Sequence, residues 1–322
     1  MNNSLTAISG LSVGHWTNAD AATGCTVILC PAGAVAGVDV RGSAPGTREI
    51  ALLDPVCSVQ KVHAIVLSGG SAFGLAAADG VMRWLEERGH GFDVGVAKVP
   101  IVPAAILFDL AIGRADVRPD AAAGYLACQS ASNGPVVQGN IGAGTGATVG
   151  KMLGFGQATK GGLGSAAKVI GKGIVVAALV AVNAIGDIID SKSGAIIAGA
   201  RRPVVGGFAD SMAFAESRLG QTIAEMANRN TTLAVVATNV ALSKVECTKV
   251  AQMAHDGLAR TIRPVHTAFD GDTIFALSAG DKSGDASLVG AVAADVLAQA
   301  VLNAVWAAEK LHGIPAAKDL TG

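Results

Sequence analysis

Continuous apolar runs alternate along the chain with segments whose apolar residues recur at helical spacing. The runs are rich in Val, Ile, Leu and Ala and are not interrupted by polar residues at every second position. This pattern is typical of short strands that are buried on both faces. We expect such strands at residues 25–30, 63–67, 174–182, 233–238 and 273–277.

Three segments have the periodicity of helices. Residues 71–88 carry apolar residues on one face, and Gly89 suits the position after a helix C-terminus. Ser243 and Glu246 have capping-box spacing and begin a second helix, and residues 285–311 predict an Ala-rich last one. The second helix places Val250, Ala254 and Leu258 four residues apart, and the last one carries Leu288, Val292, Val296 and Val305 near one side.

Residues 206–230 are polar, Ala-rich and only weakly amphipathic. The strands expected before and after them are equally apolar, so two separate domains are not required. We therefore expect one domain over residues 1–322, with an exposed excursion just before Thr231.

Composition narrows the class of protein. Hydrophobic residues make up 51% of the 322 residues and charged residues 15%, which excludes a disordered chain and favours extensive burial, including between subunits. A net charge of −1 gives no electrostatic reason to expect nucleic acid or a membrane surface as partner. The scattered cysteines lack a CxxC pair, and the N-terminus has no basic and apolar leader, which together favour a cytoplasmic protein.

The glycine-rich stretch GNIGAGTGATVGK, residues 139–151, resembles two phosphate-binding motifs and matches neither. A P-loop would need glycine at Thr145 and a hydroxyl residue at Met152, and the glycine spacing also fails the dinucleotide-binding pattern. No nucleotide or other cofactor is expected. Two interpretations remain: a loop that lets backbones approach closely, or a catalytic loop that carries Lys151.

Two other kinds of site are disfavoured. A nucleophile elbow centred on Ser71 would need glycine where Phe73 stands, so a Ser-His-Asp triad with His266 and Asp270 has weak support. The histidines never approach the H-x-x-x-H spacing of a zinc site and the carboxylates do not cluster with them, so no metal is expected.

Asn230-Thr231-Thr232 stands directly ahead of a strongly apolar run, and two interpretations of it differ in function. In the first, polar residues simply begin a strand. In the second, the bond between Asn230 and Thr231 breaks, so that Thr231 holds a hydroxyl nucleophile and a free α-amine in one residue. An α-amine has a pKa of roughly 7.7–8.0, which suits a general base near neutral pH.

Asp270-Gly-Asp272 similarly precedes the last apolar run. Alone it indicates a solvated turn. If its strand lies beside the strand that starts at Thr231, both carboxylates reach the head of that strand, where they can orient an amine, a hydroxyl or a lysine.

Several long motifs, in order and spread over nearly the whole chain, resemble the P1 peptidase family, which includes aminopeptidases, D-amidases and β-peptidyl aminopeptidases and is related to nylon-oligomer hydrolases. The motifs are VGHWT, TGCTVIL, DVRGSAPGTRE, LSGGSAFGLAAADGV, GNIGAGTGATVGK, VNAIG, NTTLAVVATN and HTAFDGDTIFALS. The resemblance implies an N-terminal-nucleophile-type hydrolase with an αββα four-layer sandwich, as in the ornithine acetyltransferases. It also implies a precursor that cleaves itself into residues 1–230 and 231–322, which stay associated.

The resemblance also implies roles for five residues of this chain. Thr231 matches the nucleophile that begins the second chain, and Lys151 matches a lysine that helps to keep the α-amine neutral. Asn183 matches the side-chain amide that stabilises the oxyanion. Asp270 and Asp272 match the acidic pair that holds the amine and the lysine in place.

We expect Phe108 and Gly144 at the substrate site. Several relatives carry a tyrosine at the position of Phe108, and the sole tyrosine of this chain, Tyr125, lies elsewhere. Substrate recognition is therefore expected to differ from that of those relatives.

The leading hypothesis is a self-processing hydrolase of small peptides or short amides that forms a homo-oligomer, with a tetramer suggested by the resemblance. Two alternatives stay open at this point. An acyl-enzyme on Thr231 can pass its acyl group to an amine, which would make the protein an acyltransferase. A chain that keeps the Asn230–Thr231 bond intact would instead be a non-catalytic, ligand-binding relative.

Overall fold

The computed structural model describes residues 2–203, 206–217 and 230–320. Within these residues the main sheet has nine strands, in the order β10-β11-β14-β16-β2-β4-β7-β3, and β1 pairs with β2. Its strands are β1 (Ser12–Asn18), β2 (Thr23–Val40), β3 (Thr47–Arg48), β4 (Lys61–Ser68), β7 (Ala104–Ile106), β10 (Gly162–Ile170), β11 (Ile174–Asn183), β14 (Thr231–Val240) and β16 (Thr273–Lys282).

Helices and short strands complete the fold. The α-helices are α1 (Ala77–Glu86), α2 (Ala121–Gln129), α3 (Ser211–Glu216), α5 (Lys244–Thr261) and α6 (Ala286–Ala307). The short 3₁₀ helices are η1 (Leu5–Ala7), η2 (Ile50–Leu53), η3 (Ser71–Ala76), η4 (Gly142–Gly144), η5 (Phe155–Gln157), η6 (Gly171–Gly173) and η8 (Ala317–Asp319). The small strands are β5 (Phe92–Asp93), β6 (Lys98–Val99), β8 (Thr148–Val149), β9 (Thr159–Lys160), β12 (Asp187–Ile189), β13 (Ile196–Ala198) and β15 (Ile262–Arg263).

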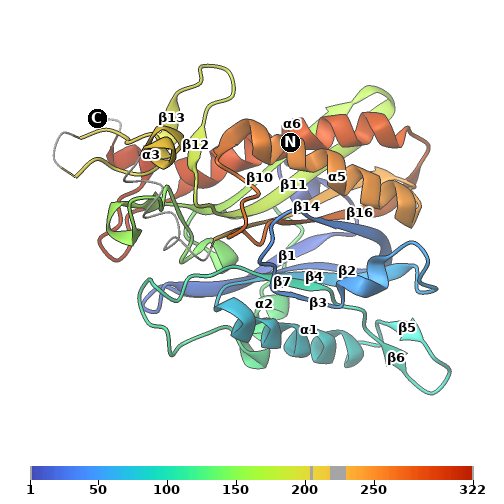
Figure 1. The fold of residues 1–322 in the computed structure, drawn as a ribbon. Coiled ribbons are helices and arrows are strands. Elements are labelled where there is room, and N and C mark those ends of the chain that lie inside the picture. The colour runs from blue at the N-terminus through green and yellow to red at the C-terminus, as the bar shows by residue number, and fades with distance from the viewer. Residues whose placement is uncertain (1, 204–205, 218–229, 321–322) are drawn as a thin grey trace.

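The long strand β2 joins two halves of the sheet. Its second half, from Val35 to Val40, pairs with β16, and its first half pairs with β1 and β4. The pairing with β4 shifts register between Leu29 and Ala34, so β2 passes from one layer of strands to the other. Figure 1 shows the outcome: α5 and α6 cover one layer, and α1 and α2 cover the opposite layer.

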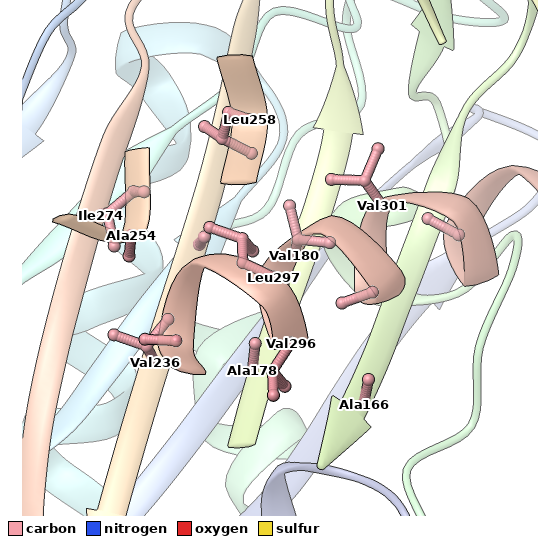
Figure 2. Close-up of a cluster of buried hydrophobic side chains, with 14 of the residues drawn as sticks. Ala166, Ala178, Val180, Val236, Ala254, Leu258, Ile274, Val296, Leu297 and Val301 are labelled. Carbon is pink, nitrogen blue, oxygen red and sulfur yellow. The ribbon is translucent and has the colours of Figure 1, made fainter. Parts of the chain in front are cut away.

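Three hydrophobic clusters among the described residues fill the spaces between these layers. One lies between the α5–α6 pair and the strands β10, β11, β14 and β16, and part of it is drawn in Figure 2. A second lies between the two layers of strands, and a third between β2, β4 and the helices α1 and α2. Helix, strand, strand, helix is the predicted αββα sandwich, and this prediction is confirmed.

Alternate residues of β14 explain why its sequence is continuously apolar. Leu233 and Val235 enter the core between the strand layers, whereas Ala234 and Val236 enter the core beneath α5 and α6. Both faces exclude water, so the strand has no solvent-facing positions along this stretch. All five predicted strands are present, and each extends beyond the apolar run that predicted it.

The predicted helices are also present, with different ends. The first begins as the 3₁₀ turn η3 before α1, and the capping box of Ser243 and Glu246 starts α5 as expected. The last helix ends at Ala307 and not at Leu311, which instead bridges to Ile314. Val292, Val296 and Val305 are buried on one side of that helix, whereas Leu288 in its first turn is 48% exposed.

Helix α6 is long and apolar enough to cross a membrane by length and composition. It packs against β10, β11 and α5, and 67% of its most apolar stretch is buried within the protein. Its hydrophobicity is therefore accounted for by its place in the core of the sandwich.

Candidate active site at the head of β14

The first residue of β14 is Thr231, and the neighbouring strands bring polar residues to it from both sides. Asn183, the last residue of β11, is the antiparallel partner of Thr231. On the other side β16 runs parallel to β14, so the two strands begin at the same edge, and Asn230 forms a bridge with Asp270. The parallel pairing across the α5 crossover thus places the Asp270–Asp272 turn beside the Asn230–Thr231 peptide.

The Asn230–Thr231 peptide is buried and held by its neighbours. The Asn230 N–H donates to the carbonyl oxygen of Phe269 at 3.3 Å, and the Asn230 carbonyl oxygen accepts the Gly271 N–H at 3.0 Å. The Thr231 hydroxyl donates to the same carbonyl oxygen. Thr231 is 4% exposed. The hydroxyl of one residue and the carbonyl group of the preceding one are therefore in contact, and a backbone donor already polarises that carbonyl.

Lys151 and Asn183 form a second buried group at this edge. The Lys151 ammonium donates to the main-chain oxygen of Asn183 at 2.9 Å and to its side-chain oxygen at 2.8 Å. The Thr148 N–H donates to the same side-chain oxygen at 3.0 Å. The Asn183 side-chain amide donates to the Phe108 carbonyl oxygen at 3.0 Å, and its second hydrogen has no partner among the described residues. Asn183 therefore keeps one N–H for a further acceptor.

Asp270 and Asp272 are 1% and 0% exposed, so their turn is not solvated, contrary to the simplest interpretation of the motif. Asp272 accepts the Thr232 N–H at 2.6 Å with one carboxylate oxygen. With the other it contacts the main chain and the imidazole Nδ1 of His266, at 3.1 and 2.8 Å. Asp270 accepts the N–H and hydroxyl of Thr267 at 2.8 and 2.6 Å. The turn is held by these hydrogen bonds, and its two acids have separate partners.

Burial dominates the electrostatics of the site. It lowers the pKa of Lys151 to about 7, although the charges of Asp270 and Asp272 oppose this shift. Burial, followed by the charge of Asp272, raises the pKa of Asp270 to about 6. Both shifts favour the uncharged form of a buried group, and perturbed pKa values of this kind are common at functional sites.

The glycine-rich loop reaches this edge by approaching other backbones closely. Gly150 has φ +66°, and a Cβ atom there would lie 2.0 Å from the backbone nitrogen of Ala200. Its N–H and that of Lys151 donate to the carbonyl oxygens of Gly186 and Ile185, at 2.9 Å each. The interpretation as a loop of closely approaching backbones is confirmed, and this packing places Lys151 at the edge of the sheet.

A cavity of about 450 Å³ opens beside the Asn230–Thr231 peptide. This volume is in the range of small-molecule sites. The lining residues are Ala44, Ser71, Phe73, Ile106, Phe108, Leu110, Asn230, Thr231, Ala268 and Phe269.

The structure places the two residues expected at the substrate site differently. Phe108 lines the cavity, and its carbonyl oxygen also orients Asn183. Gly144 does not line it: the residue is fully buried in η4, where a Cβ would lie 2.2 Å from the Leu163 backbone nitrogen. The expected excursion falls mostly on residues 218–229, which lie outside the described residues.

Two further groups, the half-buried His266 and the buried Lys160, make contacts that the sequence did not predict. His266 contacts Asp272, and its ring lies against that of His255 with 4.7 Å between centroids. Lys160 is fully buried and donates to the carbonyl oxygens of Thr145 and Ala147 at 2.8 and 2.6 Å. His266 stands in the same motif as the two acids, so its closeness to them in sequence could have indicated that it lies near the site. Nothing in the sequence around Lys160 indicated that this lysine is buried.

No three His, Cys, Asp or Glu side chains within residues 2–203, 206–217 and 230–320 come together as metal ligands. The chemistry available at this edge is that of a hydroxyl, an amine, an amide and two carboxylates. Such a set can perform nucleophilic attack and proton transfer on an amide.

Comparison with known proteins shows which family of enzymes this chain belongs to. Residues 3–318 match the model of peptidase family S58. An aminopeptidase of Mycobacterium leprae, described as uncharacterized, is 45% identical to this chain and covers 97% of it and 92% of its own length. A 6-aminohexanoate-oligomer endohydrolase of a Kocuria species is 35% identical, covering 92% of this chain and 84% of its own.

Solved structures show the same fold at lower identity. A β-aminopeptidase of a Burkholderia species matches with a TM-score of 0.72 and 22% identity over 97% of this chain and 89% of its own. The L-aminopeptidase D-Ala-esterase/amidase of Ochrobactrum anthropi, described as a variant of the Ntn hydrolase fold, matches with a TM-score of 0.73 and 21% identity. That alignment covers 96% of this chain and 87% of the other.

Proposed function

The chain belongs to peptidase family S58, whose members hydrolyse amide or peptide bonds, and from that premise we propose that it cuts its own Asn230–Thr231 bond and then uses Thr231 as its nucleophile. The observation that carries the proposal is the contact of the Thr231 hydroxyl with the Asn230 carbonyl group, at a buried strand end that also holds Lys151 and two carboxylates.

Self-cleavage follows from this contact. The Thr231 Oγ attacks the carbonyl carbon of Asn230, the amide C–N bond breaks, and the hydroxyl proton ends on the Thr231 nitrogen. The Gly271 N–H, at 3.0 Å from the Asn230 oxygen, supports the charge that develops on that oxygen. Water then hydrolyses the ester, which gives residues 1–230 with a carboxylate end and residues 231–322 with a free amine.

In the cleaved protein the free amine of Thr231 is the proposed general base. It accepts the hydroxyl proton of Thr231 as the Oγ attacks the carbonyl carbon of a substrate amide, and passes that proton to the leaving amine. The acyl group stays on Thr231 as an ester until water, activated by the same amine, releases it as an acid. The unpartnered N–H of Asn183 is the proposed oxyanion donor; a donor of this type contributes about 3–4 kcal/mol.

The remaining residues set the charge of the amine. A neutral general base is needed, and a protonated Lys151 nearby disfavours a second positive charge. Asp272, through the Thr232 N–H, fixes the backbone that carries the amine, while Asp270 balances the ammonium of Lys151. The relatives are named aminopeptidase and oligomer endohydrolase, and the chemistry proposed here could serve either activity, because both break an amide bond.

Variants at position 231 test the proposal. Thr231→Ala removes the hydroxyl, and we expect an uncut chain without hydrolytic activity on amides or p-nitroanilides. Thr231→Ser keeps a hydroxyl and serves as the matched control, and we expect it to be cut and active at a reduced rate. Denaturing gels and an anilide hydrolysis assay read both properties. An active Thr231→Ala protein would remove Thr231 from the mechanism.

A further inference from the structure

A second buried lysine lies behind the glycine-rich loop. Lys160, in β9, is fully buried, and its ammonium donates to the carbonyl oxygens of Thr145 and Ala147, at 2.8 and 2.6 Å. The residue after Ala147 is Thr148, whose N–H donates to the side-chain oxygen of Asn183 at 3.0 Å. Lys160 therefore fixes the backbone immediately before the group that holds one end of the Asn183 amide.

Asp109 anchors the other end of the Asn183 amide. The residue before it, Phe108, accepts the side-chain N–H of Asn183 with its carbonyl oxygen at 3.0 Å. Asp109 is 2% exposed, and its two carboxylate oxygens accept the Gly70 N–H and the Thr23 hydroxyl proton, at 2.7 Å each. These hydrogen bonds tie the segment that carries the Phe108 carbonyl to the turn after β4 and to the start of β2.

The two anchors also contact each other's surroundings. Gly146 lies between the two carbonyl groups that Lys160 binds, and a Cβ atom there would lie 2.7 Å from the Cβ of Asp109, so the loop packs directly on the aspartate. Burial lowers the pKa of Lys160 to about 7 and raises that of Asp109 to about 6, and the charge of each group opposes the shift of the other. The lysine and the aspartate therefore stabilise one another's charged forms.

We propose that Lys160 and Asp109 are positioning residues that hold the Asn183 amide from both ends, so that its N–H meets the oxygen of the reacting carbonyl group. The inference rests on the proposed function, in which that N–H is the oxyanion donor. A buried pair of charges is costly, and apolar side chains of similar volume often fill such a space with equal or greater stability. The need to hold a catalytic donor to within about 0.5 Å accounts for polar anchors at this place.

Lys160→Met tests the inference, because it keeps the length of the side chain and removes its charge and its donors. A misplaced oxyanion donor weakens binding of the transition state and leaves binding of the substrate unchanged. We therefore expect kcat to fall at least about tenfold, with KM changed less than about twofold. An anilide assay measures both constants, and denaturing gels give the amount of cut chain to which kcat is referred.

Lys244→Met is the matched control. Lys244 is another buried lysine, 3% exposed, whose ammonium donates to three carbonyl oxygens at 3.0 to 3.2 Å. It begins α5, which follows the end of β14 opposite to Thr231. We expect this variant to unfold at a lower temperature with kcat unchanged. An equal loss of kcat in Lys244→Met and Lys160→Met would overturn the inference, because any buried lysine would then have the same effect.

Asn183→Ala shows whether Lys160 acts through the amide. In this background there is no amide to position, so we expect Lys160→Met to lower kcat by less than about threefold further. The same factor in both backgrounds, or an unchanged kcat in Lys160→Met alone, would contradict the inference and leave the Thr231 mechanism standing. Full activity of Asn183→Ala would instead remove Asn183 as the oxyanion donor, and the inference would fail together with that step of the proposed function.

A double variant covers the case in which Lys160→Met alone does not fold. Removing one member of a buried pair leaves the other charge without compensation, whereas Lys160→Met combined with Asp109→Asn leaves neither charge. The double variant is assayed with and without Asn183→Ala, and we expect the same two factors. Equal factors in the two backgrounds would overturn the inference here as well.

Discussion

Burial, more than direct pairing, sets the chemistry of the individual side chains at the head of β14. Lys151 has its pKa lowered and Asp270 has its pKa raised by the same cause, so the two values converge from opposite directions. An exposed lysine and aspartate would be fully charged at neutral pH and could not exchange protons readily. The fold thus keeps two costly buried groups beside the bond that we propose is cut.

Because Asp270 is buried, the free energy of unfolding is expected to depend on pH. Its pKa is about 6 in the folded protein, raised above an unfolded value of roughly 3.9, so the folded state binds the proton more tightly. Stability therefore falls as the pH rises from about 4 to about 6. In a Thr231→Ala background, which keeps the chain uncut, we expect Asp270→Asn to raise the unfolding free energy at neutral pH by on the order of 1–3 kcal/mol.

Urea denaturation at several pH values measures this effect. The gain from Asp270→Asn should vanish below about pH 4, where the carboxyl is protonated in both the folded and the unfolded state. A difference that is constant over the whole pH range would show that Asp270 affects stability by some other route than its proton.

Single residues also show what sequence can and cannot reveal. Thr231, Lys151, Asn183, Asp270 and Asp272 were identified through the motifs that surround them, and the structure brings all five to one strand edge. The contacts of the Asn230 carbonyl oxygen were not predictable, because they depend on the register of β14 against the turn before β16. No spacing in the sequence encodes that register.

Elements were predictable where one physical effect dominated. The buried strands followed from continuous apolar runs, and α5 followed from its capping box. Strand β10 was missed, because its sequence GLGSAAKVI is rich in small residues. Its glycines are needed for the close approach of α6: a Cβ at Gly164 would lie 2.1 Å from the carbonyl oxygen of Ala300. Small residues chosen for helix packing do not resemble a strand in sequence.

Two glycines of the loop that carries Lys151 are expected to differ in how well they tolerate a side chain. Gly150→Ala must adopt φ near +66° and also displace the Ala200 backbone, 2.0 Å from the new Cβ. Gly154 has φ +85° with nothing within 4 Å, so Gly154→Ala has the same strain without the clash. We expect Gly154→Ala to cost about 1 kcal/mol and Gly150→Ala several times more, with slower self-cleavage.

Thermal unfolding and the time course of cleavage on denaturing gels compare these two variants. Equal stability losses would show that the close contact at Gly150 relaxes without consequence, and that the loop does not depend on it to place Lys151.

The molecule as a whole explains why the proposed fragments stay together. Residues 231–322 contain β14, β16, α5 and α6, and the neighbouring strands β14 and β16 lie in the sheet between β11 and β2 of the first 230 residues. The core beneath α5 and α6 contains residues of both pieces, such as Val180 and Leu297 (Figure 2). Neither piece can bury its apolar surface alone.

We therefore expect the cut protein to behave as one folding unit. Size-exclusion chromatography under native conditions should elute both pieces together, and calorimetry should show one unfolding transition for the two. Elution of residues 231–322 as a separate folded species would contradict the interleaved sheet.

The central claim is that the Thr231 hydroxyl cuts the bond before it. Intact-mass analysis of the purified protein under denaturing conditions, with N-terminal sequencing, tests it most directly. We predict two polypeptides that correspond to residues 1–230 and 231–322, the smaller beginning with Thr-Thr-Leu. A single chain of the full 31.9 kDa that nevertheless hydrolyses amides would contradict the account.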